Sequence, residues 1–134
     1  MNKVFITASF KSGENKQEIE QLCALVKAGG FEDFCFIRDV ENYQKVFNDP
    51  KELMLRAKEE ISKCDFLLID LTDKPTGRAY EAGIAYALNK KIIVILKKGT
   101  PIKDTTSGIA DSIIEYKNIE DIVPGLQNVL NSYH

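Results

Sequence analysis

The stretch DFLLIDLTDKPTGRAYEAGIAYALNKKIIVIL, residues 65–96, decides the fold. It begins with a short, continuous apolar run, Asp65–Leu71, and ends with a second one, Lys91–Leu96, each typical of a strand that is buried on both faces. Between them, a loop with a proline and a glycine precedes Arg78–Leu88, which has the composition of a helix. This order of strand, helix and strand predicts a βαβ unit in a parallel sheet.

The same alternation continues on both sides of this stretch. Further strands are predicted at Lys3–Thr7, Asp33–Arg38 and Ser112–Tyr116, and further helices at Asn15–Ala28, residues 50–63 and Ile119–Asn131. Residues 99–108 are predicted to be a polar loop. The pattern therefore predicts a three-layer α/β fold of the flavodoxin or Rossmann-like kind, with a five-stranded parallel sheet in the order 2-1-3-4-5. Residues 1–134 are expected to form a single domain.

Composition and charge exclude several classes of function. The net charge is −2 and the basic residues are scattered, which argues against a nucleic acid polymer as partner. Three separated cysteines without a CxxC pair argue against a disulfide framework, and each is expected to be a small buried residue: Cys23, Cys35 and Cys64. The only histidine is the last residue, His134, so neither a catalytic triad nor a usual zinc site is expected.

No apolar run approaches the ~18 residues that suggest a membrane span, so no membrane partner is expected. The N-terminus lacks a signal-peptide pattern, and the cytoplasm is the predicted location.

Glu81 is the residue on which a reactive site would centre. After Arg78, its helix is small or apolar apart from two tyrosine hydroxyls, which predicts a buried helix. An unpaired buried carboxylate is costly, and the nearby helix N-terminus favours its charged form, as a nucleophile or a metal ligand needs. The structural alternative is that Glu81 hydrogen-bonds the helix start or pairs with Arg78.

Two aspartates flank the loop that precedes this helix. Asp70 ends the third predicted strand and Asp73 follows it, so both are candidates to face Glu81 across the crevice at the carboxyl ends of the strands. Paired carboxylates in different environments are the usual groups that cleave glycosidic bonds. The alternative is that Asp73 caps a turn and Asp70 caps the helix.

The loop after the first strand is the candidate phosphate site. It contains two serines, a lysine and a glycine: Ser9, Lys11, Ser12 and Gly13. Such residues before a helix N-terminus suit an anion, although an ordinary polar loop fits equally well. Arg38 and Asp39 end the second predicted strand near the same crevice, and Tyr43 is either a stacking surface or a packing residue.

Residues 64–96, together with the N-terminal VFITASFKSG, resemble the nucleoside 2-deoxyribosyltransferase family, including its branch of 2'-deoxynucleoside 5'-phosphate N-hydrolases. The pattern is an aspartate that opens a strand, a short loop, G-x-x-Y-E-x-G-x-A, and a strand led by lysine. The resemblance covers most of the chain. It implies cleavage of the N-glycosidic bond of (deoxy)nucleoside 5'-monophosphates, by hydrolysis or by base transfer, without a metal or an organic cofactor.

The resemblance also assigns roles to residues. Glu81 matches the glutamate that attacks the anomeric carbon and forms a glycosyl-enzyme intermediate. Ser9 and Lys11 match residues that hold the 5'-phosphate, and Gly77 matches a glycine at the helix start. Ser107 matches, more loosely, a loop serine that reaches the phosphate site of a neighbouring subunit. A homo-oligomer, a dimer or larger, is implied because members of the family usually form one.

The chain departs from the family pattern at two positions. The hydrolase branch carries an aspartate where this chain has Ala57, and the transferase branch carries one where it has Pro75. Asp70 or Asp73 is then the candidate to position the sugar or to protonate the leaving base. Two alternatives follow: a nucleotide-binding module without turnover, and a glutamate-dependent NAD glycohydrolase that resembles the TIR-type enzymes.

Overall fold

The strands form one parallel sheet, as the alternating apolar runs predict. The computed structural model describes residues 2–9, 15–73 and 76–133. The sheet order is β2-β1-β3-β4-β5 with every neighbouring pair parallel, which confirms the predicted order. The strands are β1 (Lys3–Ile6), β2 (Glu32–Cys35), β3 (Phe66–Asp70), β4 (Lys91–Lys97) and β5 (Ser112–Tyr116).

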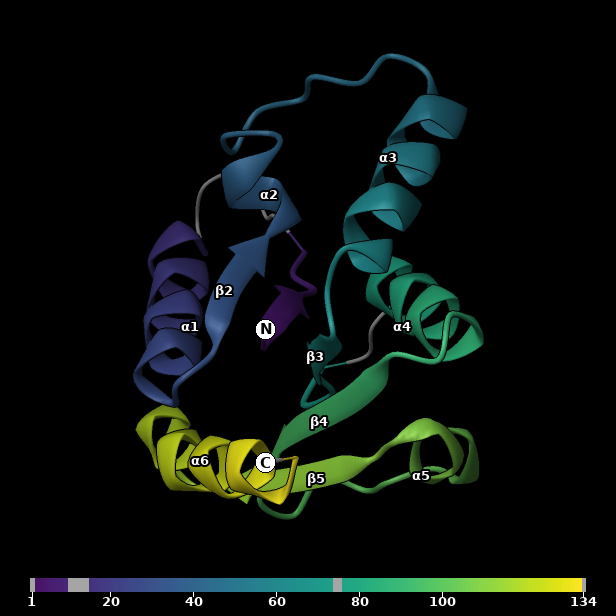
Figure 1. Ribbon diagram of the computed structural model, residues 1–134. Helices are drawn as coiled ribbons and strands as arrows, with labels where there is room; N and C mark the ends of the chain where they lie inside the picture. The colour runs from purple at the N-terminus through teal and green to yellow at the C-terminus, as the bar shows by residue number, and fades with distance from the viewer. Residues whose placement is uncertain (1, 10–14, 74–75, 134) are drawn as a thin grey trace.

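Helices cover both faces of the sheet and so complete the predicted three layers. One face packs against α1 and α6, and the other against α3 and α4 (Figure 1). The helical segments are α1 (Lys16–Ala28), α2 (Phe36–Asp39), α3 (Pro50–Ser62), α4 (Gly77–Ala87), α5 (Asp104–Ile109), the 3₁₀ turn η1 (Ile119–Asp121) and α6 (Ile122–Ser132).

The central strands supply both halves of the core. Successive side chains of a strand point to opposite faces, so in β3 Leu68 packs on the side of α1 and α6, while Leu67 packs on the side of α3 and α4. In β4, Ile93 and Ile92 divide in the same way, and all four side chains are at most 1% exposed. This two-sided burial explains why these strands appear in the sequence as continuous apolar runs.

Local signals set several helix ends. The Asp49 side chain accepts a hydrogen bond from the Lys51 N–H (3.0 Å), and Pro50 opens α3 as predicted. Pro124 lies within α6, whose first turn tolerates proline because the N–H groups there have no partner in the helix. Gly30 follows α1 with φ +101°, a conformation that glycine adopts without strain.

Two predicted elements were wrong. The segment Asp33–Arg38 is not one strand, because β2 ends at Cys35 and α2 begins at Phe36. The Asp39 carboxylate accepts a hydrogen bond from the Cys35 N–H (2.9 Å), which stabilises this change of direction. The predicted loop at 99–108 contains the short helix α5, whose serine, threonine and glycine residues hide it from a propensity argument.

The burial of two helices also differs from the prediction. In α4 only Ala82 and Ala85 are buried, while Tyr80 and Tyr86 are 69% and 54% exposed, because a narrow stripe of small residues contacts the sheet. In α3, Met54 is 39% exposed, although an apolar residue of an amphipathic helix is expected to face the core.

Position 60 of α3 is buried instead. The Glu60 carboxylate is held by the guanidinium of Arg56 at 2.9 Å and lies 3.5 Å from the Lys63 ammonium. A paired carboxylate is buried at much lower cost than a free one.

All three cysteines are at most 1% exposed, as the sequence predicts. His134 lies outside the described residues. None of the helices in the described part of the chain has the length and apolar composition that crossing a bilayer requires.

Candidate active site

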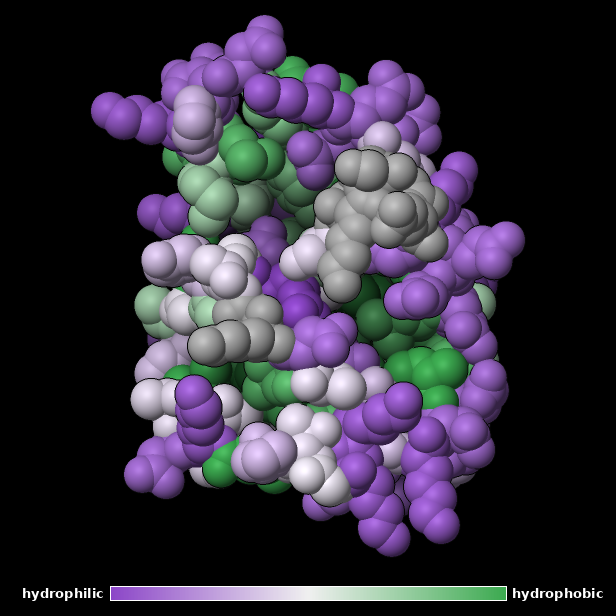
Figure 2. Space-filling model, turned by 180° about the vertical axis from the view of Figure 1, so that it is seen from behind, coloured by the Kyte–Doolittle hydropathy of each residue, from purple (hydrophilic) through white to green (hydrophobic). Residues whose placement is uncertain are grey.

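Two adjoining hollows lie at the carboxyl ends of β1 and β3, where the sheet order predicts a ligand site. The smaller one, about 210 Å³, contains Glu81 and is called the Glu81 hollow. The larger one, about 450 Å³, contains Asp70 and is called the Asp70 hollow. Both are lined by Ala8, Ser9 and Arg78, so they share a wall. In the view from behind, hydrophilic residues meet in a recess at the centre of the molecule, with hydrophobic side chains nearby (Figure 2).

Glu81 is only partly exposed, and none of the described residues hydrogen-bonds its carboxylate. Burial raises the pKa of Glu81 to about 8, Cys35 and the Glu41 carboxylate add to this effect, and the Arg78 guanidinium opposes it. The expectation that the helix N-terminus keeps Glu81 ionised was therefore wrong. Glu81 is the fifth residue of α4, beyond the first turn in which the helix dipole acts, so desolvation prevails.

Glu41 is the carboxylate that lines the same hollow as Glu81. It lies two residues beyond the end of α2, and burial raises its pKa as well. Sequence reasoning did not select it. The available signal was its place just beyond the end of the second strand, at the same edge of the sheet as the other candidates.

Asp70 lies in the neighbouring hollow, and its carboxylate is fully engaged. One oxygen accepts from the N–H (2.9 Å) and the hydroxyl (2.7 Å) of Thr72, and the other accepts from the Tyr116 hydroxyl (2.7 Å). It thus caps the turn after β3 and ties this turn to β5. Asp73 is exposed at the rim of the same hollow, and neither aspartate lines the Glu81 hollow.

Two polar atoms at these hollows are buried without a hydrogen bond to any described residue: Thr7 Oγ1 and Arg78 Nε. Thr7 lines the Asp70 hollow, and Arg78 lines both hollows while its Nη1 donates to the carbonyl of Asp70 (2.7 Å). Buried groups without partners are rare in folded proteins and require an explanation. Their place beside a hollow suits a ligand that supplies the missing acceptor for Arg78.

Only some of the other predicted binding residues line the two hollows. Ser9 is exposed and lines both hollows, whereas Lys11 and Ser12 fall outside the described residues. Gly77 begins α4 at the Glu81 hollow, and an added Cβ there would contact nothing within 4 Å. Ser107 is exposed on α5 and lines neither hollow.

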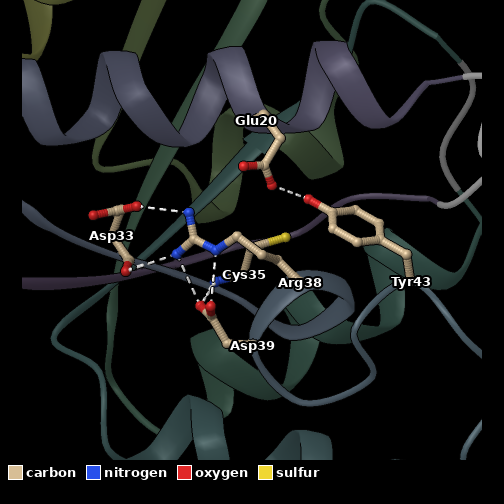
Figure 3. A network of polar contacts seen from close by, with 6 residues as sticks. All are labelled: Glu20, Asp33, Cys35, Arg38, Asp39 and Tyr43. Carbon is tan, nitrogen blue, oxygen red and sulfur yellow. Dashed lines mark hydrogen bonds and ion pairs between the residues drawn. The ribbon is translucent and has the colours of Figure 1, made fainter.

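Arg38 and Asp39 bind each other and do not line either hollow. The Arg38 guanidinium donates to the carboxylates of Asp33 (2.9 Å) and Asp39 (2.8 Å), as Figure 3 shows. Tyr43 donates its hydroxyl to the Glu20 carboxylate of α1 and packs against the core. These residues therefore connect β2, α2 and α1 beside the site, without lining either hollow.

No group of three or more histidine, cysteine, aspartate or glutamate side chains in the described ranges is arranged to hold a metal ion.

The fold and this placement of the hollows define a flavodoxin-like α/β protein with a carboxylate site at the β1/β3 switch point. No protein-family model and no curated protein matches the sequence. Among solved structures, the chain is similar to the CMP N-glycosidase BcmB of Clostridium botulinum, with 22% identity, a TM-score of 0.67 and coverage of 95% of this chain and 99% of that one.

It is also similar to a 2-deoxyribosyltransferase from Bacillus psychrosaccharolyticus, with 18% identity, a TM-score of 0.70 and 90% of each chain covered. A third similar structure is BlsM, with 22% identity, a TM-score of 0.70 and coverage of 98% of this chain and 90% of that one. The chain thus has the fold of the nucleoside 2-deoxyribosyltransferase-like proteins, as the resemblance predicts.

The raised pKa of Glu81 has a measurable consequence for stability. The folded value, about 8, lies above the ordinary 4.5, so the folded state binds a proton more tightly than the unfolded state between these values. Glu81 must therefore lower the free energy of unfolding progressively as the pH rises from about 4.5 to about 8. We expect Glu81→Gln to be more stable than the wild type at pH 9 and to lose this advantage at pH 5. Urea unfolding at both values checks this, and the same pH dependence in both proteins would contradict it.

Proposed function

We propose that the protein cleaves the N-glycosidic bond of nucleoside 5'-monophosphates with Glu81 as the nucleophile. The observation that carries this proposal is a partly buried carboxylate, without a hydrogen-bond partner among the described residues, in a hollow at the switch point of the sheet. Such a group is available to a substrate. The similar structures of a CMP N-glycosidase and a 2-deoxyribosyltransferase support this type of reaction.

In the proposed reaction, a carboxylate oxygen of Glu81 attacks C1' of the sugar. The C1'–N bond breaks, its electron pair remains on the base nitrogen, and the sugar becomes an ester of Glu81. Water then attacks C1' and releases the sugar phosphate, or a second base attacks and a new nucleotide forms. Two displacements at C1' retain the configuration of the sugar.

The walls of the hollows suggest how the substrate lies. The apolar side of the Glu81 hollow suits the base, and is formed by Phe36, Ile37, Leu53, Met54 and Ala57. Ser9 and the free Nε of Arg78 lie where the two hollows meet and suit the phosphate. Lys11 and Ser12 remain proposed phosphate ligands on the resemblance alone. Asp73, at the rim of the Asp70 hollow, and Asp70 remain candidates to position the sugar.

We also expect a homo-oligomer in the cytoplasm. Exposed apolar residues gather on two packed helices, Tyr80 and Tyr86 on α4 with Met54 and Leu55 on α3, which favours burial against a second copy. In such an assembly, Ser107 remains a candidate to reach the site of a neighbouring subunit.

The proposal is tested by incubating the protein with ribo- and deoxyribonucleoside 5'-monophosphates, the matching nucleosides and NAD, and by measuring released base by chromatography. We expect a monophosphate to be cleaved with a kcat/KM roughly 10- to 150-fold above that of its nucleoside, because a charged hydrogen bond contributes about 1.5–3 kcal/mol. Thermal stabilisation by a nucleotide without base release would instead indicate a binding module. Nicotinamide release from NAD alone would indicate the NAD glycohydrolase.

A further inference from the structure

The proposed reaction lacks an acid for the leaving base. A base that departs with the electron pair of the C1'–N bond needs a proton, and general acids supply it in most glycosidases. Ala57, where the resembled hydrolases carry an aspartate, lines the Glu81 hollow with a methyl group only. The carboxylate of Asp70 is held by Thr72 and Tyr116 in the other hollow.

We propose that Glu41 is this acid, a further catalytic residue that protonates the leaving base while Glu81 attacks the sugar. The inference rests on the proposed function. Glu41 and Glu81 line the same small hollow, but they come from different elements, the turn after α2 and helix α4. A base seated in this hollow therefore lies beside both carboxyl groups.

The turn that carries Glu41 is held in an unusual conformation. The next two residues, Asn42 and Tyr43, have φ of +48° and +58°, a backbone conformation that residues other than glycine adopt at a cost. Such backbone persists only where its surroundings hold it, and it is frequent at active sites. Here the Tyr43 N–H donates to the Ile37 carbonyl (2.8 Å), and the Gln44 N–H donates to the Glu41 carbonyl (3.0 Å).

Side chains fix the same turn from outside. The Tyr43 hydroxyl donates to Glu20 of α1 (Figure 3). The Lys16 ammonium lies 4.7 Å from the centre of the Tyr43 ring. On the other side, Arg38 bridges two aspartates and so fixes α2, which precedes the turn. The Arg38 charge is matched by these aspartates, so it does not serve as an ion-pair partner for Glu41.

The pair is suited to hold one proton. Burial raises the pKa of Glu41 and that of Glu81, and two nearby carboxylates resist losing both protons. The other titratable groups that act on Glu81 are Cys35, which raises its pKa, and Arg78, which lowers it. The mechanism requires the proton on Glu41 and the charge on Glu81. Because burial and the Glu41 charge raise the pKa of Glu81, this is the less populated of the two singly protonated forms.

The step balances without a further reactant. Glu41 gives its proton to the base nitrogen as the C1'–N bond breaks and the bond from C1' to a Glu81 oxygen forms. In hydrolysis, the Glu41 carboxylate then takes a proton from the water that attacks C1', Glu81 leaves as a carboxylate, and the starting state is restored.

Comparing a purine nucleoside 5'-monophosphate with its N7-methylated form tests the role of Glu41. The methylated base leaves as a neutral molecule and needs no proton. We expect Glu41→Gln to reduce base release from the unmodified nucleotide by about 10²- to 10⁴-fold, and to leave release from the methylated one within a few-fold of the wild type. Glu41→Asp, which retains a carboxylic acid, should recover part of the loss. Glu52→Gln, an exposed glutamate on α3, is the matched control.

The pH profile supplies an independent readout. An acid must be protonated, so kcat/KM of the wild type should fall on the alkaline side with the unmodified nucleotide but not with the methylated one. If Glu41→Gln slowed base release from both nucleotides equally, or from neither, the role of Glu41 would be overturned while the proposed function stands. A wild type that releases base from neither nucleotide would overturn the proposed function, and the role of Glu41 with it.

Discussion

Replacing Glu81 with glutamine is expected to reduce base release by about three to six orders of magnitude, as the loss of a nucleophile does in other enzymes that form covalent intermediates. Glutamine has the shape of glutamate but cannot form the sugar ester. The loss should extend to N7-methylated nucleotides, because methylation replaces the proton donor and not the nucleophile. Initial rates of base release under saturating substrate measure the effect.

The fold of this variant is not expected to suffer. Glu81 accepts no hydrogen bond from the described residues, so its replacement leaves no such donor unpaired. Glu115→Gln, the same change at an exposed position of β5, controls for the loss of one charge and should retain full activity. A Glu81→Gln protein that keeps more than a tenth of the wild-type rate would exclude Glu81 as the nucleophile.

Replacing Leu126 with alanine is expected to cost about 2–5 kcal/mol of the free energy of unfolding, because Leu126 of α6 is fully buried and the change leaves a cavity. A Cβ added to Gly29, at the end of α1, would lie 2.8 Å from the Leu126 Cβ. Gly29→Ala should therefore cost about 1–3 kcal/mol by overpacking, although its φ of −74° suits alanine.

The two substitutions should be coupled. Leu126→Ala keeps the Leu126 Cβ but removes the Cδ1 that would lie 3.3 Å from a Cβ on Gly29, and the cavity it leaves gives the two helices room to adjust. The double variant should therefore lose less stability than the sum of the single variants. Urea unfolding of the four proteins gives the coupling. Gly83→Ala, where an added Cβ meets nothing within 4 Å inside α4, is the control and should be neutral or stabilising. Strict additivity would contradict the close packing of α1 against α6.

The sheet was predictable because burial dictates its sequence pattern. Strands with helices on both faces must be apolar throughout, so β3 and β4 are visible as short continuous runs, and the right-handed crossover rule then limits the order. The end of β2 at Cys35 and the start of α2 at Phe36 could not be predicted from the sequence pattern. This boundary depends on the Asp39 carboxylate accepting from the Cys35 N–H, a contact between side chain and backbone that periodicity does not report.

The site was predictable only in part. Glu81 was found because a carboxylate among apolar residues requires a reason, and the structure places it beside a hollow. Its charge state was misjudged, since the balance between helix dipole and burial depends on the surroundings in three dimensions. Glu41 was missed because the turn that places it in the hollow with Glu81 includes two residues of left-handed backbone conformation, Asn42 and Tyr43. No local sequence signal marks this conformation.

The same dependence on tertiary structure separates Asp70 from Glu81. Both lie at the same edge of the sheet, as predicted, but Arg78 stands in the wall between their hollows. The Tyr116 hydroxyl that holds Asp70 comes from β5, 46 residues further along the chain. Contacts at that separation are set by the fold rather than by the spacing of a motif.

Trapping the glycosyl-enzyme would decide whether Glu81 attacks the sugar. A 2'-fluoro-2'-deoxyarabinonucleoside 5'-monophosphate suits this purpose, because fluorine destabilises the oxocarbenium-like transition state and slows the release of the sugar. Trypsin cleaves after Arg78 and Lys90 to give AYEAGIAYALNK, residues 79–90, in which Glu81 is the only carboxylate side chain. We expect this peptide to carry the mass of the fluorinated sugar phosphate in the wild type and not in Glu81→Gln. Release of the base with this peptide unlabelled, or with the label on another peptide, would contradict the proposed mechanism.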